Sequence, residues 1–87
     1  MNKVHIEGEM TIYRAAELKE QVLAPLKDAG PIEIDLSAVS EIDSVGVQLL
    51  LLARRDAQAQ QRPLRLLNLS PAVVDAFELL DLHGHFH

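Results

Sequence analysis

The 87-residue sequence contains no cysteine and no tryptophan, and aromatic residues make up only 3% of it. Without cysteine the chain can form neither a disulfide framework nor a thiol-based active site. The scarcity of aromatic side chains also argues against the stacking platforms that bind single-stranded nucleic acids. The core must therefore be built from Leu, Val, Ile and Ala, which the 48% apolar content allows.

Basic residues and long hydrophobic runs are also scarce. Eight Lys and Arg residues face 13 Asp and Glu residues, the net charge is −5, and the cations are scattered along the chain. We therefore expect no nucleic-acid partner. The longest apolar run, Leu49–Ala53, is far shorter than the ~20 residues that span a bilayer. Since residues 1–8 do not resemble a signal peptide, we expect a cytoplasmic protein without membrane insertion.

Familiar catalytic patterns are missing too. The four glycines are widely separated, so no glycine-rich phosphate loop is present and a kinase is not expected. The histidines lie at the two ends of the sequence, at position 5 and beyond position 82, far from the central serine that a Ser-His-Asp set would need. We therefore expect no enzyme, no catalytic residues and no cofactor.

Three histidines close the sequence, at positions His83, His85 and His87. In an extended strand all three imidazoles would point to one side, as in a zinc or nickel site. The competing interpretation is a frayed terminus or the stub of a last strand. Physiological metal sites usually recruit ligands from more than one element, so we expect no bound metal.

The chain is organised around Ile32–Arg55. Ile32, Ile34 and Leu36 alternate with acidic residues, which predicts a short half-buried strand with its carboxylates on the other face. A loop punctuated by polar residues should follow it. Beyond Asp43 and Ser44 the apolar spacing changes towards 3.6, which predicts the start of a helix.

Similar units flank this stretch. A first strand should cover residues 3–7, and a helix capped by Thr11 should run to about Ala29, unless Pro25 kinks it or ends it early. A third strand should begin near Leu64, and Ser70 should cap a last helix. Three strands joined by helical crossovers predict a mainly parallel sheet with the helices on one face. The fold class is thus α/β, a small two-layer, singly wound βα sandwich that forms one domain over residues 1–87.

The start of the central helix offers two interpretations. Asp43 or Ser44 can cap the helix by accepting hydrogen bonds from its first N–H groups. Alternatively, Ser44 is a phosphorylation site, because the positive end of the helix dipole would hold a phosphate placed there. Gly46 falls on the buried arc, where the absence of a side chain would let the helix approach a neighbouring strand or loop closely.

A helical wheel divides the central helix into two arcs. Its core arc carries small and apolar residues, and the opposite arc carries Ser44, Val47, Gln48, Leu51, Arg54, Arg55 and Gln58. Val47 and Leu51 are therefore apolar residues on a polar face. They are either ordinary exposed residues or part of a docking patch. The predicted partner-binding residues are Asp43, Ser44, Val47, Gln48, Leu51 and Arg55.

The run DLSAVSEIDSVG resembles the signature of STAS domains. The similarity extends from EGEMTIYRAAELK to LRLLNLSPAVVDAFELLDL, although the chain looks shortened at both ends relative to the family. The resemblance implies the βα fold predicted above. In the branch of anti-sigma-factor antagonists, the serine that matches Ser44 is phosphorylated by an anti-sigma kinase, and the preceding aspartate matches Asp43.

Two functions follow from this resemblance. The first is a non-enzymatic binding module whose affinity for an anti-sigma serine kinase, or for a chemosensory kinase assembly, is set by phosphorylation of Ser44. The second is a constitutive subunit that docks through the same helix face on the ATPase of a phospholipid-transport ABC system. Shortened ends would also leave strand edges less protected, which favours a homodimer or strand pairing with a partner.

Overall fold

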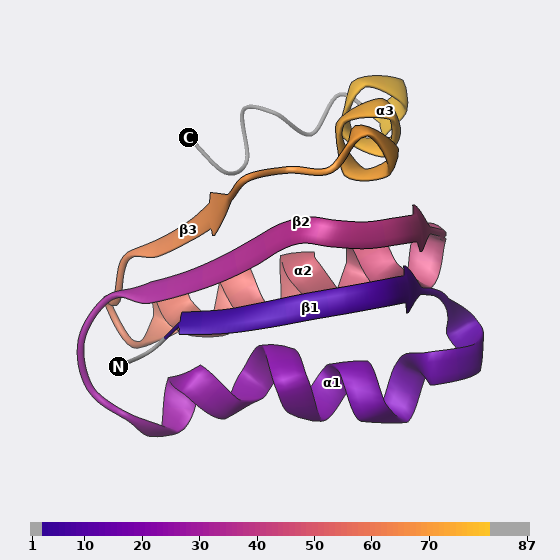
Figure 1. The fold of residues 1–87 in the computed structure, drawn as a ribbon. Coiled ribbons are helices and arrows are strands. Elements are labelled where there is room, and N and C mark those ends of the chain that lie inside the picture. The colour runs from indigo at the N-terminus through magenta and orange to yellow at the C-terminus, as the bar shows by residue number, and fades with distance from the viewer. Residues whose placement is uncertain (1–2, 81–87) are drawn as a thin grey trace.

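The computed structural model describes residues 3–80, which form a three-stranded parallel sheet and three α-helices (Figure 1). The strands lie in the order β1-β2-β3. This confirms the predicted α/β class and its alternation of strands and helices. The elements in chain order are β1 (Lys3–Met10), the 3₁₀ turn η1 (Ile12–Arg14), α1 (Ala15–Leu23), the 3₁₀ turn η2 (Ala24–Lys27), β2 (Ile32–Ile42), α2 (Ser44–Ala59), β3 (Leu64–Leu67) and α3 (Pro71–Leu80).

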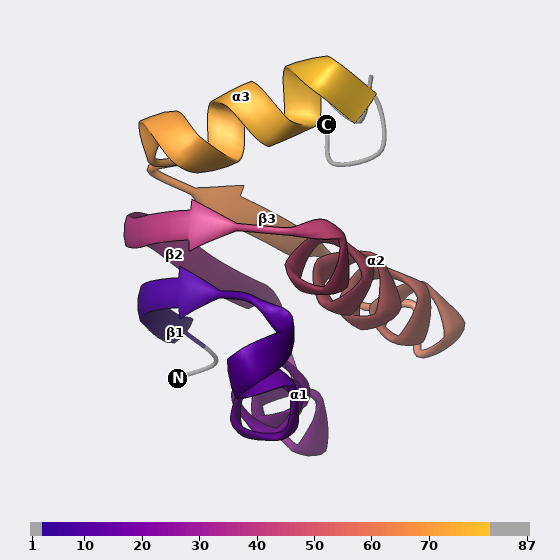
Figure 2. The ribbon, with the colours of Figure 1, turned by 90° about the vertical axis from the view of Figure 1, so that its right-hand side faces the viewer.

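The helices do not all stand in the same relation to the sheet. Figure 2 looks at the carboxyl ends of the strands and shows α1 and α2 on one side of the sheet, with α3 across its β3 end. α3 contacts β2 there, and its Val73 and Phe77 are buried. Ser70 caps this helix as predicted, because its Oγ accepts a hydrogen bond of 3.3 Å from the Val73 N–H.

The core lies between the sheet and α1 and α2 and continues under α3. Each fully buried aliphatic side chain stabilises the fold by about 1.5–3 kcal/mol relative to exposure. Phe77 is the aromatic member of this core, as expected for a chain with so few aromatic residues. The largest side chains without exposed surface are Phe77, Ile6, Met10, Leu18, Ile32, Ile34, Leu36, Leu50, Val22 and Val73.

The central strand is longer than its alternation predicted. β2 runs to Ile42, so the prediction of a loop after Leu36 is wrong. The second half of β2 stays extended because it pairs with the end of β1, where Gly8 lies beside Val39 and Met10 beside Ile42. Backbone pairing of this kind does not require alternating apolar side chains. Asp43 is therefore the single residue between the end of β2 and the start of α2.

The first helical segment also differs from its prediction in one respect. The Thr11 side chain caps nothing, and its buried Oγ1 has no hydrogen-bond partner among the described residues. Pro25 acts as predicted: α1 ends at Leu23 and the chain continues as η2, because proline lacks the N–H that would extend the helix.

At the opposite end of the molecule, near the amino ends of β2 and β3, an arginine side chain bonds to several backbone carbonyls. The guanidinium of Arg62 donates to the carbonyls of Gly30 at 2.9 Å, Leu26 at 2.8 Å and Pro25 at 3.0 Å. These carbonyls belong to the end of the first helical segment and to the loop before β2. One side chain thus ties the loop before β3 to the crossover that precedes β2.

Candidate functional site

Asp43 is the residue that organises the start of α2. Its Oδ1 accepts hydrogen bonds from the N–H groups of Val45 at 2.9 Å and Gly46 at 3.1 Å. Its Oδ2 accepts a third bond, 3.0 Å long, from the Ile12 N–H of η1. The Ile12 N–H is the main cause that lowers the pKa of Asp43 below its usual value, since bonds to the charged form favour ionisation.

The cap therefore comes from Asp43, and Ser44 occupies the first position of the helix. The Ser44 side chain is exposed. Capping does not occupy its hydroxyl, because both N–H groups that the cap satisfies bond to the neighbouring carboxylate. Of the two residues that the sequence offered as caps, the structure selects Asp43.

Gly46 makes the close approach that the sequence predicted. A Cβ atom on Gly46 would lie 2.2 Å from the Met10 carbonyl oxygen and 2.8 Å from Cγ1 of Ile42. The Asp43 N–H also donates to the Met10 carbonyl at 3.2 Å. The start of α2 is thus pressed against the end of β1, so the position of Ser44 is fixed relative to the sheet.

The outer face of α2 carries most of the predicted partner-binding residues. Gln48, Leu51 and Arg55 line one shallow hollow of about 310 Å³ together with Leu52. Leu52 was not predicted, because the wheel placed it on neither arc. Val47 does not belong to this face: only 4% of its surface is exposed, so the prediction of an exposed Val47 is wrong.

Sequence reasoning missed two exposed apolar side chains in the turn that is bonded to Asp43. Ile12 is 60% exposed and Tyr13 is 90% exposed, and both belong to η1. The Asp43 carboxylate connects this turn to the start of α2. The available signal was that these two apolar residues lie outside the helical repeat that begins at Ala15.

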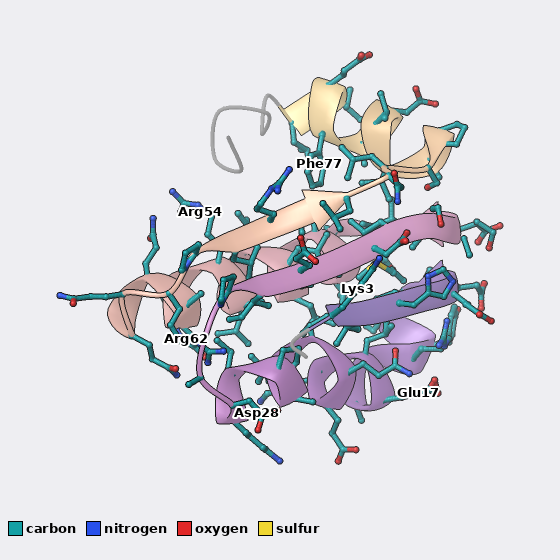
Figure 3. The ribbon with its side chains drawn as sticks, turned by 60° about the vertical axis from the view of Figure 1, so that its left-hand side comes forward. Lys3, Glu17, Asp28, Arg54, Arg62 and Phe77 are labelled. Atoms are coloured by element: carbon teal, nitrogen blue, oxygen red, sulfur yellow. The ribbon has the colours of Figure 1, made fainter. Side chains whose placement is uncertain are left out.

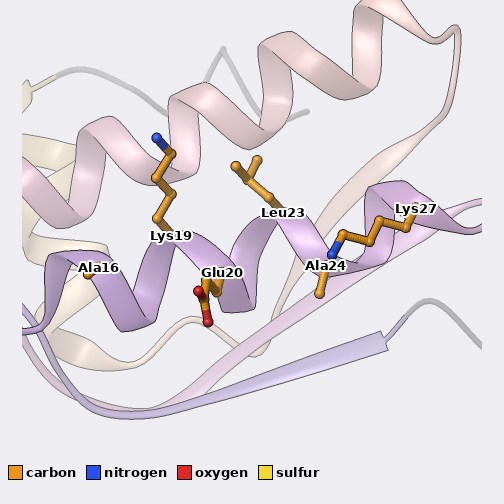
Figure 4. A pocket seen from close by; sticks show the side chains of 6 residues that line it. All are labelled: Ala16, Lys19, Glu20, Leu23, Ala24 and Lys27. Atoms are coloured by element: carbon orange, nitrogen blue, oxygen red, sulfur yellow. The ribbon is translucent and has the colours of Figure 1, made fainter.

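A second hollow, of about 740 Å³, lies along α1 and η2 (Figure 4). In that view Lys19 and Leu23 point towards α2, whereas Glu20 and Ala24 point away from it. Its lining holds two lysine ammonium groups and one carboxylate but no Ser, Thr, Cys or His side chain. The residues that line it are Ala16, Lys19, Glu20, Leu23, Ala24 and Lys27.

A polar cluster lies on the side of the sheet away from the core. Oδ1 of Asp35 accepts the Ser37 N–H at 2.9 Å, and its Oδ2 accepts the Asn68 side-chain amide at 3.3 Å. The bonds from Ser37 are the main cause that lowers the pKa of Asp35 to about 2. Nδ1 of His5 lies 3.8 Å from Oδ2 of Asp35, and its Nε2 lies 3.5 Å from Oε1 of Glu7.

Within residues 3–80, no group of three or more His, Asp or Glu side chains, this cluster included, could hold a metal ion. The histidines at 83, 85 and 87 lie outside the described residues. No helix in the described part of the chain is long and apolar enough to cross a bilayer.

Fold and site together define a class of protein: a small α/β domain with a parallel sheet, whose central helix starts at an aspartate cap followed by an exposed serine. The family model described as "Mlab, STAS domain" matches residues 2–86. The anti-sigma-B factor antagonist of Staphylococcus aureus (strain NCTC 8325 / PS 47) is 30% identical over 87 residues, which cover 98% of this chain and 80% of that protein. The chain belongs to the STAS domain family.

Other comparisons agree. The anti-sigma-B factor antagonist of Staphylococcus epidermidis is 28% identical over 87 residues, and the match covers 98% of this chain and 80% of that protein. The solved structure of the anti-sigma factor antagonist SpoIIAA in its unphosphorylated form matches with a TM-score of 0.77. Its sequence identity is 23%, and the match covers 98% of this chain and 76% of that one. The shared fold is therefore well supported along nearly the whole chain.

Proposed function

We propose that this chain is a non-enzymatic binding module of the antagonist type, which docks on an anti-sigma serine kinase in the cytoplasm and is released when Ser44 is phosphorylated. The observation that carries the proposal is the geometry of the α2 start. Ser44 is exposed beside a hollow lined by Gln48, Leu51 and Arg55, while Asp43 alone performs the cap. The relatives named anti-sigma-B factor antagonists support the same assignment.

The cap determines what a phosphate at Ser44 would do. A helix start ordinarily offers free N–H groups to an anion, but the Asp43 carboxylate already occupies those of Val45 and Gly46. A phosphate would therefore keep most of its charge, about −1.5 to −2, directed towards solvent or a partner. Next to the Asp43 carboxylate, this added charge would weaken a docked complex by repulsion and by desolvation.

The test is a capture experiment from a lysate of the source organism with three baits: wild type, Ser44→Asp and Gln58→Asp. Gln58 is exposed near the other end of α2, so it controls for one added charge on the same helix. We expect wild type and Gln58→Asp to capture a sigma-regulating kinase, Ser44→Asp to lose it, and mass spectrometry to detect phosphate on the Ser44 peptide. Equal capture of that kinase by all three baits would contradict control by phosphorylation.

A second candidate is a constitutive subunit on the ATPase of a phospholipid-transport ABC system. The matching family model is named for Mlab and not for the antagonists, and the apolar Leu51 and Leu52 on the outer face of α2 would dock without any phosphate. Under this alternative, wild type and Ser44→Asp would capture a transport ATPase equally, and Ser44 would be unmodified. A chemosensory kinase in the captured fraction would instead place the module in that signalling system.

A further inference from the structure

The exposed pair Ile12 and Tyr13 lies where β1 ends and η1 begins. Their exposed fractions are 60% and 90%, and Leu79 of α3, which lines a hollow with Glu41 and Ile42, is exposed to 85%. The chain has only three aromatic residues, and one of them, Tyr13, lies on this surface and not in the core. Exposed tyrosine is enriched among the residues that dominate binding energy at protein interfaces.

Both flanks of this turn are held in place. Asp43 accepts the Ile12 N–H at 3.0 Å, and Nη1 of Arg14 donates to the carbonyls of Glu7 and Glu9, each at 2.6 Å. Nη2 of Arg14 also donates to Oε1 of Glu17 at 2.8 Å. The backbone that presents Ile12 and Tyr13 is therefore fixed to β1 and to the start of α2. A presented side chain on a fixed backbone loses less conformational entropy when it binds.

Two acidic residues lie on the ends of β1 and β2, just before η1 and α2. Glu9 and Glu41 are exposed and lie side by side on β1 and β2, where like charges weaken strand pairing. Neither side chain forms an ion pair with Lys or Arg in the described residues. The two carboxylates lie on the strand ends that lead into η1 and α2.

Cations are concentrated elsewhere. Of the eight Lys and Arg residues, Arg14 is the one at the carboxyl ends of the strands, and its guanidinium is already bonded. Lys3 and Arg65 lie at the amino ends of β1 and β3, and the others lie in η2, in the loop before β3, or along α1 and α2. In Figure 3 Glu17 lies at one end of the molecule, and Arg54 and Arg62 lie towards the other, as does the acidic Asp28.

From these observations we infer that Ile12 and Tyr13 are the apolar anchor of the partner interface, and that the partner presents an apolar pocket bordered by Lys or Arg side chains. The inference rests on the proposed function, because the anchor is continuous with Ser44 through the Asp43 carboxylate. A second copy of this chain is a poor occupant. Two-fold pairing through this surface would bring the unpaired carboxylates of Glu9 and Glu41 against their own copies.

The first test replaces Tyr13 by the photoreactive amino acid p-benzoylphenylalanine in living cells of the source organism, with Asp28 replaced in the same way as a control at the opposite end. We expect a protein adduct at position 13 and none at position 28. Mass spectrometry should place the adduct in an apolar segment of the partner with Lys or Arg beside it. A yield at position 13 no higher than at position 28, an adduct with a second copy of this chain, or an adduct in an acidic segment would overturn the inference.

The second test titrates the purified partner so identified with folded variants. Tyr13→Ala and Glu9→Lys should each weaken binding about tenfold, the size of a moderate hot spot, whereas Asp28→Lys and Leu80→Ala should change it less than about twofold. If all four variants bind the partner within twofold of the wild-type affinity, the assignment of Ile12 and Tyr13 as the anchor is wrong. Loss with Tyr13→Ala but not with Ser44→Asp would retain the anchor and reject control by phosphorylation, so the two proposals fail separately.

Discussion

The two ends of this domain are closed by single charged side chains of opposite sign. At the carboxyl ends of the strands, the Asp43 carboxylate accepts three backbone N–H groups from α2 and η1. At the amino ends, the Arg62 guanidinium donates to three backbone carbonyls. Each side chain matches the unpaired backbone groups at its end: free N–H groups where a helix starts, and free carbonyls where one finishes.

The difference between the ends lies in what surrounds these side chains. Around Asp43 the structure leaves Ser44 and Tyr13 exposed. Within residues 3–80, Glu9 and Glu41 at this end form no ion pair with Lys or Arg. Arg62, in contrast, bonds to the segments that surround it. The function proposed above assigns the exposed features around Asp43 to partner binding. We therefore expect changes near Asp43 to affect both stability and binding, and changes near Arg62 to affect stability alone.

The largest effect should come from Gly46→Ala. The new Cβ would lie 2.2 Å from the Met10 carbonyl oxygen, so α2 must move away from β1 and the packing beneath it must loosen. We expect a loss of about 3 kcal/mol in the free energy of unfolding, at the upper end for overpacking. Urea unfolding followed by far-ultraviolet circular dichroism measures it. A loss below about 0.5 kcal/mol would mean that the contact is not tight.

Arg62→Ala should follow, with a loss of about 2 kcal/mol, because three carbonyls lose a charged donor. Arg62→Lys should recover only part of it, since a single ammonium cannot reach three carbonyls as the guanidinium fork does. The same unfolding assay tests both variants. For the comparison of the two ends, the decisive measurement is partner affinity at a temperature where Arg62→Ala is fully folded. Weaker binding by that variant would contradict a purely structural amino end.

Asp43→Asn should have a smaller effect, a loss of about 1 kcal/mol, because the amide keeps one acceptor for the α2 cap and loses the second acceptor that holds Ile12. Asp43→Ala should lose about twice as much. Both variants should also weaken partner binding, since the turn that presents Tyr13 is released. Unchanged affinity in Asp43→Ala would show that the two ends do not differ in this respect.

The smallest effect should arise on the sheet face between the two ends. The pKa of Asp35 falls from 3.8 in the unfolded chain to about 2 in the folded protein, mainly through the bonds from Ser37. The stability that the ionised carboxylate contributes is therefore present above about pH 4 and is lost as the pH falls towards 2. Urea unfolding between pH 5 and pH 2 should show a shallower decline for Asp35→Asn than for wild type. Identical slopes would refute the assignment.

The order of elements could be predicted from the sequence because hydrophobic periodicity survives in each of them. The three-residue alternation from Ile32 to Leu36, the helix start at Asp43 and Ser44, and the break near Pro25 all reflect local chemistry. Gly46 was also predictable, since a glycine on the buried arc of a helix needs a reason. The STAS resemblance then joined these local patterns into one fold.

What escaped prediction depends on contacts between distant segments. The second half of β2 is a strand because β1 lies beside it, and no local pattern records that pairing. Val47 is buried because burial on the flank of a helix depends on its neighbours, which a helical wheel does not contain. Ile12 and Tyr13 were missed because their exposure contradicts their hydrophobicity, and only the folded arrangement reveals it.

The triple hydrogen bonding of Asp43 also has a dynamic consequence. Three amide protons, those of Ile12, Val45 and Gly46, share one carboxylate although 31 positions separate Ile12 from Asp43. Rotation of that one side chain exposes all three amides to solvent together, so they should exchange with deuterium as one opening unit. The turn after β1 and the first turn of α2 should thus open together. A partner that binds one of them should also slow the hydrogen exchange of the other.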